Sequence, residues 1–344
     1  MWYVAAASRD VSVGTLLART IVGEPLVLGR RPDGSVFALG DVCPHRGMPL
    51  HHGQLDGECL RCCFHGWAFD TTDGRCTEVP ALTPDQTVDL SKIRTRRYAC
   101  HEANGNLWVF VPADSARSPI PDESLPPVPT VPGATGLEPQ VAASRRVPCN
   151  FEPLIMGLID PAHLNYVHTN RWWKPSRRPQ REKTKQFEPT RLGFRMVRHA
   201  VPAISSRLFR VLGRNVTNEI TFELPGTRVD YFEGSSHRIV IYFTVTPVDG
   251  EMSDIHFRVY WSNPWLGALR PFARLVARRF IAEDVSVTIK QAEGLRFERA
   301  SIYLNDADTQ IKWYFRLVHA YAEAASSGRP FENPLEPTTL RWRT

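Results

Sequence analysis

Two different hydrophobic patterns divide the chain. The first part alternates short β-rich stretches with turn sequences, and the stretches include residues 26–28, 36–39 and 107–111. Prolines then crowd residues 112–139, where no helix can continue, so an extended connector is expected. We therefore predict two domains and a linker, with limits at residues 1–112, 113–140 and 141–344.

The second part mixes helical and strand patterns. An apolar run at residues 154–159 predicts a buried helix that Pro161 interrupts. Residues 265–281 have helical spacing, with Trp265, Leu269 and Phe272 on an apolar face that we expect in the core. Antiparallel strands and a last helix are predicted at residues 218–224, 228–232, 238–246, 254–261 and 310–325. Together the patterns predict the α+β class, with a domain of short strands and turns followed by an antiparallel sheet and helices.

Composition and charge narrow the function classes. The chain is 42% hydrophobic and 23% charged, as in ordinary globular proteins, and no apolar run approaches the ~18 residues of a membrane span. The N-terminus lacks the pattern of a secretory signal, so we expect a cytoplasmic protein for which a membrane partner is unlikely. The net charge of +6 includes no block of five like charges, so no nucleic-acid partner is expected.

Two Cys–His pairs in the first part predict a metal cluster. Cys43 and His45 form one pair, and Cys62 and His65 form the other, with residues 46–61 between the pairs. Two thiolates and two imidazoles suit a Rieske [2Fe–2S] cluster, in which the cysteines hold one iron and the histidines hold the other. Zinc is the alternative, but zinc sites usually join a Cys-x(2–4)-Cys unit to a His-x(3–5)-His unit.

A second candidate metal site follows the proline-rich segment. His163 lies three residues after Asp160, so the two share a helical face. His168 lies five residues after His163, and the two imidazoles converge only if the helix ends or bulges between them. Two histidines and a carboxylate on one face of an iron leave positions open for oxygen and substrate. Asp160 is also a candidate helix N-cap.

With these two motifs the chain resembles the Rieske non-haem iron aromatic-ring-hydroxylating oxygenases, and most closely the vanillate O-demethylase-like branch of their oxygenase components. The residues that match are Cys43, His45, Cys62 and His65, and the Asp-x(2)-His-x(4)-His motif of Asp160, His163 and His168. The resemblance implies an N-terminal Rieske β-sandwich and a C-terminal catalytic domain of the helix-grip (Bet v1-like or START-like) kind.

The resemblance also implies roles for two carboxylates. Asp284 begins an Asp-x-x-Val pattern after an acidic residue, and by this context it matches the residue that supplies the third iron ligand in the family. Its neighbour Glu283 is the alternative ligand. Asp160 matches the carboxylate that, in the family, bridges the cluster of one subunit and the iron of the next. That role implies a head-to-tail homotrimer.

The activity that the resemblance implies is that of a terminal oxygenase. A separate reductase or ferredoxin, supplied by NAD(P)H, reduces the [2Fe–2S] cluster, which passes electrons to a mononuclear Fe(II). With O₂ this iron hydroxylates or oxidatively demethylates a small aromatic or other apolar substrate, as a monooxygenase or dioxygenase of aromatic compound catabolism. A Rieske electron carrier without oxygenase activity and a zinc-stabilised binding protein are the alternatives.

Overall fold

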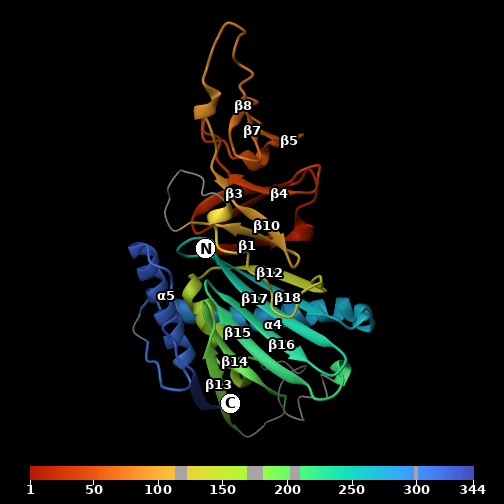
Figure 1. The fold of residues 1–344 in the computed structure, drawn as a ribbon, viewed down its shortest axis with the longest axis vertical. Helices are drawn as coiled ribbons and strands as arrows, with labels where there is room; N and C mark the ends of the chain where they lie inside the picture. Colours follow the sequence, from red (N-terminus) through yellow and green to blue (C-terminus); the bar gives the residue numbers. More distant parts are fainter. Residues whose placement is uncertain (113–121, 169–180, 202–209, 298–300) are drawn as a thin grey trace. The chain divides into compact units, whose positions relative to one another are not determined.

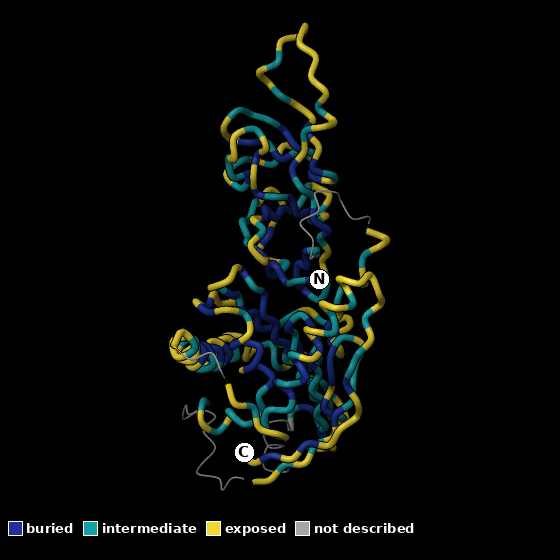
Figure 2. Tube along the Cα trace, turned by 90° about the vertical axis from the view of Figure 1, so that its left-hand side faces the viewer, coloured by how far each residue is buried: buried dark blue, intermediate teal, exposed yellow. Residues whose placement is uncertain are grey.

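The chain divides into two units in the computed structural model, which describes residues 1–112, 122–168, 181–201, 210–297 and 301–344 (Figure 1). One unit comprises Met1–Thr130 with Thr246–Asp249, and the other comprises Val131–Val245 with Gly250–Thr344. The domain limits from the sequence, at residues 1–112, 113–140 and 141–344, stay a prediction. In each unit the buried positions lie in the interior, whereas residues 81–91 form a largely exposed loop (Figure 2).

The described part of the first unit holds three antiparallel sheets. One has the order β1 (Trp2–Ala7), β11 (Asn106–Phe110) and β10 (Cys100–Ala103). The next has the order β2 (Leu16–Ile21), β3 (Glu24–Arg30), β4 (Val36–Gly40) and β9 (Arg97–Tyr98). The third has the order β5 (Gln54–Asp56), β6 (Cys59–Arg61), β7 (Ala68–Asp70) and β8 (Cys76–Glu78).

Strand β3 joins the two cores of this unit, because successive side chains of a strand point to opposite faces. Leu26 and Leu28 pack with Leu107 of β11 in one core. Val27, between them, packs in the other core with Cys43 and Cys62. The predicted strands at residues 26–28, 36–39 and 107–111 are thus present, and the sandwich places two predicted cluster ligands beside a rigid apolar core.

The second unit is built on one eight-stranded sheet. Its order is β12 (Val141–Val147), β18 (Ser253–Trp261), β17 (Arg238–Pro247), β16 (Thr227–Glu233), β15 (Thr217–Glu223), β14 (Gly193–Ala200), β13 (Glu182–Pro189) and β19 (Thr338–Arg343). Its helices are α1 (Phe151–Ile159), α2 (Leu164–Val167), α4 (Arg270–Gly294) and α5 (Thr309–Ser327). The predicted α+β class, with a β-sandwich and then a helix-packed antiparallel sheet, is confirmed.

One face of this sheet carries the helices, and we call it the inner face. Trp313 of α5 packs edge-on against Phe187 of β13 and Phe194 of β14, with ring centroids 5.5 Å and 5.2 Å away. Phe222 of β15 lies opposite Phe194 in register and contacts Tyr314 of α5. Buried aromatic pairs of this kind contribute stabilisation beyond their area, so α5 is fixed against this face.

The amphipathic helix predicted at residues 265–281 differs from the observed one. Residues Pro264–Leu269 form a 3₁₀ helix, and α4 begins only at Arg270. The predicted core face was wrong: Trp265 is 85% exposed, and Leu269 and Phe272 are also exposed. Because a 3₁₀ helix has about three residues per turn, Trp265 and Leu269 do not continue the helical face of α4.

The buried positions of α4 form a different stripe. They are Ala277, Ile281, Val285 and Thr288, which recur at helical spacing. This stripe fixes the rotation of α4 about its axis and so the direction in which Glu283 and Asp284 point. No helix within the described ranges combines the length and the apolar content needed to cross a membrane.

Candidate metal centres

The four predicted cluster ligands come together in the first unit. Cys43 and His45 follow β4, whereas Cys62 and His65 follow β6. Both cysteines are buried, and the rings of His45 and His65 meet edge-on with centroids 4.6 Å apart. Burial, with a smaller contribution from the neighbouring Cys62 thiol, raises the pKa of the Cys43 thiol to about 11. A metal cluster relieves this penalty, because it binds the thiolate and supplies the positive charge that the site lacks.

The two ligand loops have the same turn. The amide of Gly47 donates to the carbonyl of Cys43 (2.9 Å), and the amide of Gly66 donates to that of Cys62 (3.1 Å). Both glycines have φ of 73°, in the left-handed region where a side chain is strained. Trp67 follows the second turn, and its ring stacks on that of His45 at 4.5 Å and 4°. Trp67 therefore covers one face of a predicted iron ligand.

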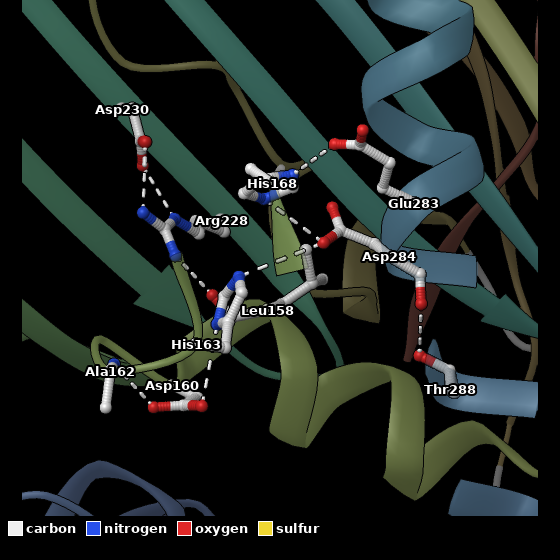
Figure 3. Close-up of polar contacts among 10 residues, drawn as sticks. All are labelled: Leu158, Asp160, Ala162, His163, His168, Arg228, Asp230, Glu283, Asp284 and Thr288. Atoms are coloured by element: carbon white, nitrogen blue, oxygen red, sulfur yellow. Dashed lines mark hydrogen bonds and ion pairs between the residues drawn. The ribbon is translucent and has the colours of Figure 1, made fainter. Parts of the chain in front are cut away.

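The second centre lies at the junction between the end of α1 and the start of α2 (Figure 3). Pro161 breaks the helix after Ile159, and the chain resumes a helical turn only from Leu164. The short helix α2 ends at Val167, so His168 leaves it with φ −86° and ψ 75°. This end brings the rings of His163 and His168 to a centroid distance of 5.5 Å, which a continuous helix would not do.

Asp284 of α4 completes a group of three metal-binding side chains. One ligand atom each of His163, His168 and Asp284 lies within 4.8 Å of the others. Asp284 Oδ1 is 3.3 Å from His168 Nε2 and 3.8 Å from His163 Nε2. Burial raises the pKa of Asp284, although His168, His163 and Arg228 oppose the shift. His168 Nε2 is buried and has no hydrogen-bond partner among the described residues, so these atoms fit a divalent metal ion.

The outer nitrogens of the two imidazoles face carboxylates. His168 Nδ1 lies 3.1 Å from Glu283 Oε2 and donates to it when protonated, and the ring also stacks on Phe280 at 3.9 Å. His163 Nδ1 lies 3.5 Å from Asp160 Oδ2. The contact with Glu283 fixes the tautomer of His168 and leaves Nε2 for the metal, whereas His163 Nδ1 has no hydrogen-bond partner among the described residues. Glu283, the alternative ligand, therefore lies on the far side of His168 from Asp284.

Asp160 has two separate contacts. Asp160 is the C-cap residue of α1, whereas His163 is at the N-cap of α2, so the predicted N-cap role of Asp160 is wrong. Its Oδ1 accepts a hydrogen bond from the amide of Ala162 (2.7 Å), which closes a local turn after α1. Its Oδ2 faces His163, and about a quarter of its side chain remains exposed.

A buried ion pair supports this centre, and sequence reasoning did not identify it. Arg228 of β16 donates to both carboxylate oxygens of Asp230, at 2.7 Å and 3.0 Å. Its third nitrogen donates to the carbonyl of Leu158 in the last turn of α1 (Figure 3). Alternation within the strand could have placed Arg228 and Asp230 on one face, but only the packed structure brings that face to α1.

Other predicted segments fall outside this centre. The basic, aromatic segment after His168 lies outside the described residues as far as residue 180. Asp308 is at the N-cap of α5, but its carboxylate accepts from the amide of Leu304 (2.8 Å) instead of capping the helix. Asp306 accepts from the amide of Arg341 (2.9 Å). Neither carboxylate belongs to the three-residue metal group.

Two family models match the chain, one in each half. The Rieske [2Fe–2S] domain matches residues 1–98, which contain the four predicted cluster ligands. The vanillate O-demethylase oxygenase C-terminal domain matches residues 147–318, half of the chain, which contain His163, His168 and Asp284.

Similar proteins include several oxygenase components. The oxygenase component of dicamba O-demethylase from Stenotrophomonas maltophilia is 36% identical over 172 residues, covering 48% of this chain and 46% of that protein. The phthalate 4,5-dioxygenase oxygenase subunit of Pseudomonas putida is 26% identical over 287 residues, covering 76% of this chain and 59% of that protein. The chain thus spans about half the length of the curated relatives it matches.

Solved structures share the fold. Dicamba monooxygenase bound to dicamba aligns with a TM-score of 0.67 and 23% identity over 94% of this chain and 98% of that one. A mutant of Pseudomonas putida NdmA with caffeine aligns with a TM-score of 0.71 and 20% identity over 98% and 95%. At this identity the alignments establish the two-domain fold and nothing about the substrate.

Proposed function

This chain belongs to the Rieske oxygenases with a vanillate O-demethylase-type C-terminal domain, and from that premise we propose that it is the terminal oxygenase of a multicomponent system. The family carries a Rieske [2Fe–2S] cluster and a mononuclear iron. We assign Cys43, His45, Cys62 and His65 to the cluster and His163, His168 and Asp284 to the iron. The convergence of the last three residues within 4.8 Å is the observation that carries the proposal.

Each side chain near the iron has a definite task in this proposal. When bound, the iron supplies O₂ activation and the cluster supplies electrons. His163, His168 and Asp284 would hold the metal as its three protein ligands, and such a ligand set would leave positions open for O₂ and substrate. Glu283 accepts a hydrogen bond from the protonated Nδ1 of His168, which leaves the lone pair of Nε2 free to bind the metal. The stacked ring of Phe280 holds the His168 imidazole in its plane.

We assign to Asp160 the transfer of electrons between subunits. The proposed assembly is a homotrimer in which the cluster of one subunit serves the iron of the next. Asp160 Oδ2 faces the outer nitrogen of His163, and its partly exposed carboxylate can accept a second hydrogen bond from a cluster histidine of the partner subunit. In this proposal Asp160 connects the two centres through its contacts with the two histidines.

The substrate and electron donor follow from the relatives. Dicamba O-demethylase and phthalate 4,5-dioxygenase point to hydroxylation or oxidative demethylation of a small aromatic or apolar compound. Hydroxylating an O-methyl group gives a hemiacetal, whose C–O bond breaks to release formaldehyde and leave a free hydroxyl group. A separate reductase or ferredoxin, using NAD(P)H, supplies the electrons. A cytoplasmic location fits the seven free cysteines.

Metal analysis of variants tests the proposal. The purified protein is expected to hold about three irons and two sulfides per chain. His163→Ala and Asp284→Ala each lose about one iron and all turnover but keep the Rieske spectrum, because the two centres lie in different units. About two irons with full cluster occupancy, unchanged by added Fe(II), would instead indicate an electron carrier. If Glu283→Ala loses the iron and Asp284→Ala keeps it, the third ligand is misassigned.

A further inference from the structure

Arg61 lies directly before a predicted cluster ligand and binds the loop that follows. It is the last residue of β6, and Cys62 comes next in the chain. Its Nη1 donates to the carbonyl of Gly66 at 2.9 Å. Gly66 in turn follows His65, the second ligand of this loop. Arg61 therefore connects the start of the second ligand loop with its end.

Two carboxylates hold the same guanidinium in place. The Nη2 of Arg61 donates to Glu78 of β8 at 2.8 Å and to Asp56 of β5 at 3.2 Å. The hydrogen bond with Glu78, followed by that with Asp56, raises the pKa of Arg61, so its positive charge is permanent. The side chain of Arg61 is 25% exposed, whereas those of Glu78 and Asp56 are 51% and 61% exposed. Solvent and salt therefore screen the positive charge less than either negative charge.

The chain that leaves β8 also packs on this loop. A Cβ atom added at Gly66 would lie 3.1 Å from Cγ of Pro80, which follows Glu78 by two residues. Such a distance is a tight van der Waals contact, so the turn at Gly66 lies directly against Pro80. The second ligand loop is thus attached to the end of β8 twice, through the ion pair of Arg61 and Glu78 and through direct packing.

A fixed charge on a ligand loop changes the reduction potential of the cluster that the loop holds. Reduction of a [2Fe–2S] cluster adds one negative charge. A nearby positive charge therefore favours the reduced state and raises the potential, whereas a nearby negative charge lowers it. Arg61 is bound to the loop through the Gly66 carbonyl and is the least exposed charge of its group. Its effect on the cluster should therefore exceed that of either carboxylate.

We propose that Arg61 is a positioning residue of the Rieske centre and that its charge raises the reduction potential of the cluster. Its hydrogen bond to Gly66 fixes the turn between Cys62 and Gly66, and Glu78 and Asp56 keep the guanidinium beside that turn. In the proposed oxygenase, the electron donor then reduces the cluster more readily than it would without Arg61. This consequence rests on the proposed function, whereas the effect on the potential requires only the cluster.

Redox titration of the purified holoprotein at low ionic strength, followed by the Rieske absorption, tests this role. Arg61→Gln should lower the equilibrium constant of one-electron reduction at least about threefold, which corresponds to a fall of roughly 30 mV. Glu78→Gln should raise the potential, by a smaller amount because this carboxylate is half exposed. Arg61→Lys keeps the positive charge and should stay close to the wild type.

The opposite signs separate the effect of charge from that of loop support. Arg61→Gln and Glu78→Gln break the same ion pair, so a purely structural role would shift both potentials in the same direction. The control is Arg75→Gln, which removes an arginine that is 55% exposed and pairs with Asp73 in the turn between β7 and β8. This variant should leave the potential unchanged.

The proposal is overturned if Arg61→Gln does not lower the potential or if Glu78→Gln does not raise it. Iron and sulfide analysis shows whether each variant keeps its cluster. If Arg61→Gln loses the cluster, the potential of Glu78→Gln decides alone, and a value at or below that of the wild type overturns the proposal. Because the titration needs neither substrate nor mononuclear iron, absent oxygenase activity leaves its outcome unaffected. Intact activity with unchanged potentials refutes only the role of Arg61.

Discussion

Replacing Arg228 with methionine should destabilise the catalytic unit and release its mononuclear iron. The side chain of Arg228 is 18% exposed and that of Asp230 is 15% exposed, so solvent screens the pair only weakly. Methionine leaves the Asp230 carboxylate buried without its partner and removes the donor to the Leu158 carbonyl. The same change frees the end of α1, which leads directly into the turn that carries Asp160 and His163.

The expected loss can be estimated from the contacts. Removing one partner of a buried, bidentate ion pair costs about 3–5 kcal/mol, because the remaining charge stays buried. For a unit of roughly 200 residues, each kcal/mol lowers the melting temperature by about 2–4 °C. We therefore expect the transition of the catalytic unit to fall by about 10 °C. The Rieske absorption should change little, since the cluster belongs to the other unit.

Scanning calorimetry and iron analysis measure these effects against two controls. Arg228→Met combined with Asp230→Leu should recover most of the stability, because both charges are then removed together. Arg195→Met in β14 breaks the pair with Glu188 of β13, in which two nitrogens of Arg195 donate to one carboxylate oxygen and the side chains are 46% and 43% exposed. This exposed pair should contribute less than about 1 kcal/mol. The reasoning is refuted if the melting temperature of Arg228→Met lies within about 2 °C of that of the wild type. It is also refuted if the double variant melts no higher than Arg228→Met.

Three more outcomes follow from the two metal centres. Glu283→Ala should weaken mononuclear iron binding about 10–100-fold, measured by metal competition, and unchanged affinity would show that the His168 contact is incidental. Asp160→Asn should keep both metals, since Asn closes the local turn as well as Asp, yet slow single-turnover oxidation of the reduced cluster; a wild-type rate reduces Asp160 to its part in that turn. Iodoacetamide should label exposed Cys63 in the holoprotein but Cys62 only after cluster removal, and labelling of Cys62 beforehand, seen by peptide mass spectrometry, contradicts its ligand role.

The sequence predicted the metal-binding groups better than their surroundings. Spacing predicted that the helix ends or bulges between His163 and His168 if both bind one metal, and α2 ends there. Asp284, in contrast, is distant in the sequence and was assigned only through the family resemblance. The contact of Glu283 with His168 depends on the rotation of α4, which is set by its buried stripe and not by any local motif.

Two features that the sequence did not predict share a physical cause. The apolar side chains of Trp265 and Leu269 suggested a core-facing helix, but a 3₁₀ turn shifts them out of phase with α4. No sequence motif marks Lys183 and Lys185, yet pairing with β19 places them on the same strand face as buried Phe187. In both cases the face of an element is decided by its neighbours, and a periodic pattern cannot identify which of its faces will be covered.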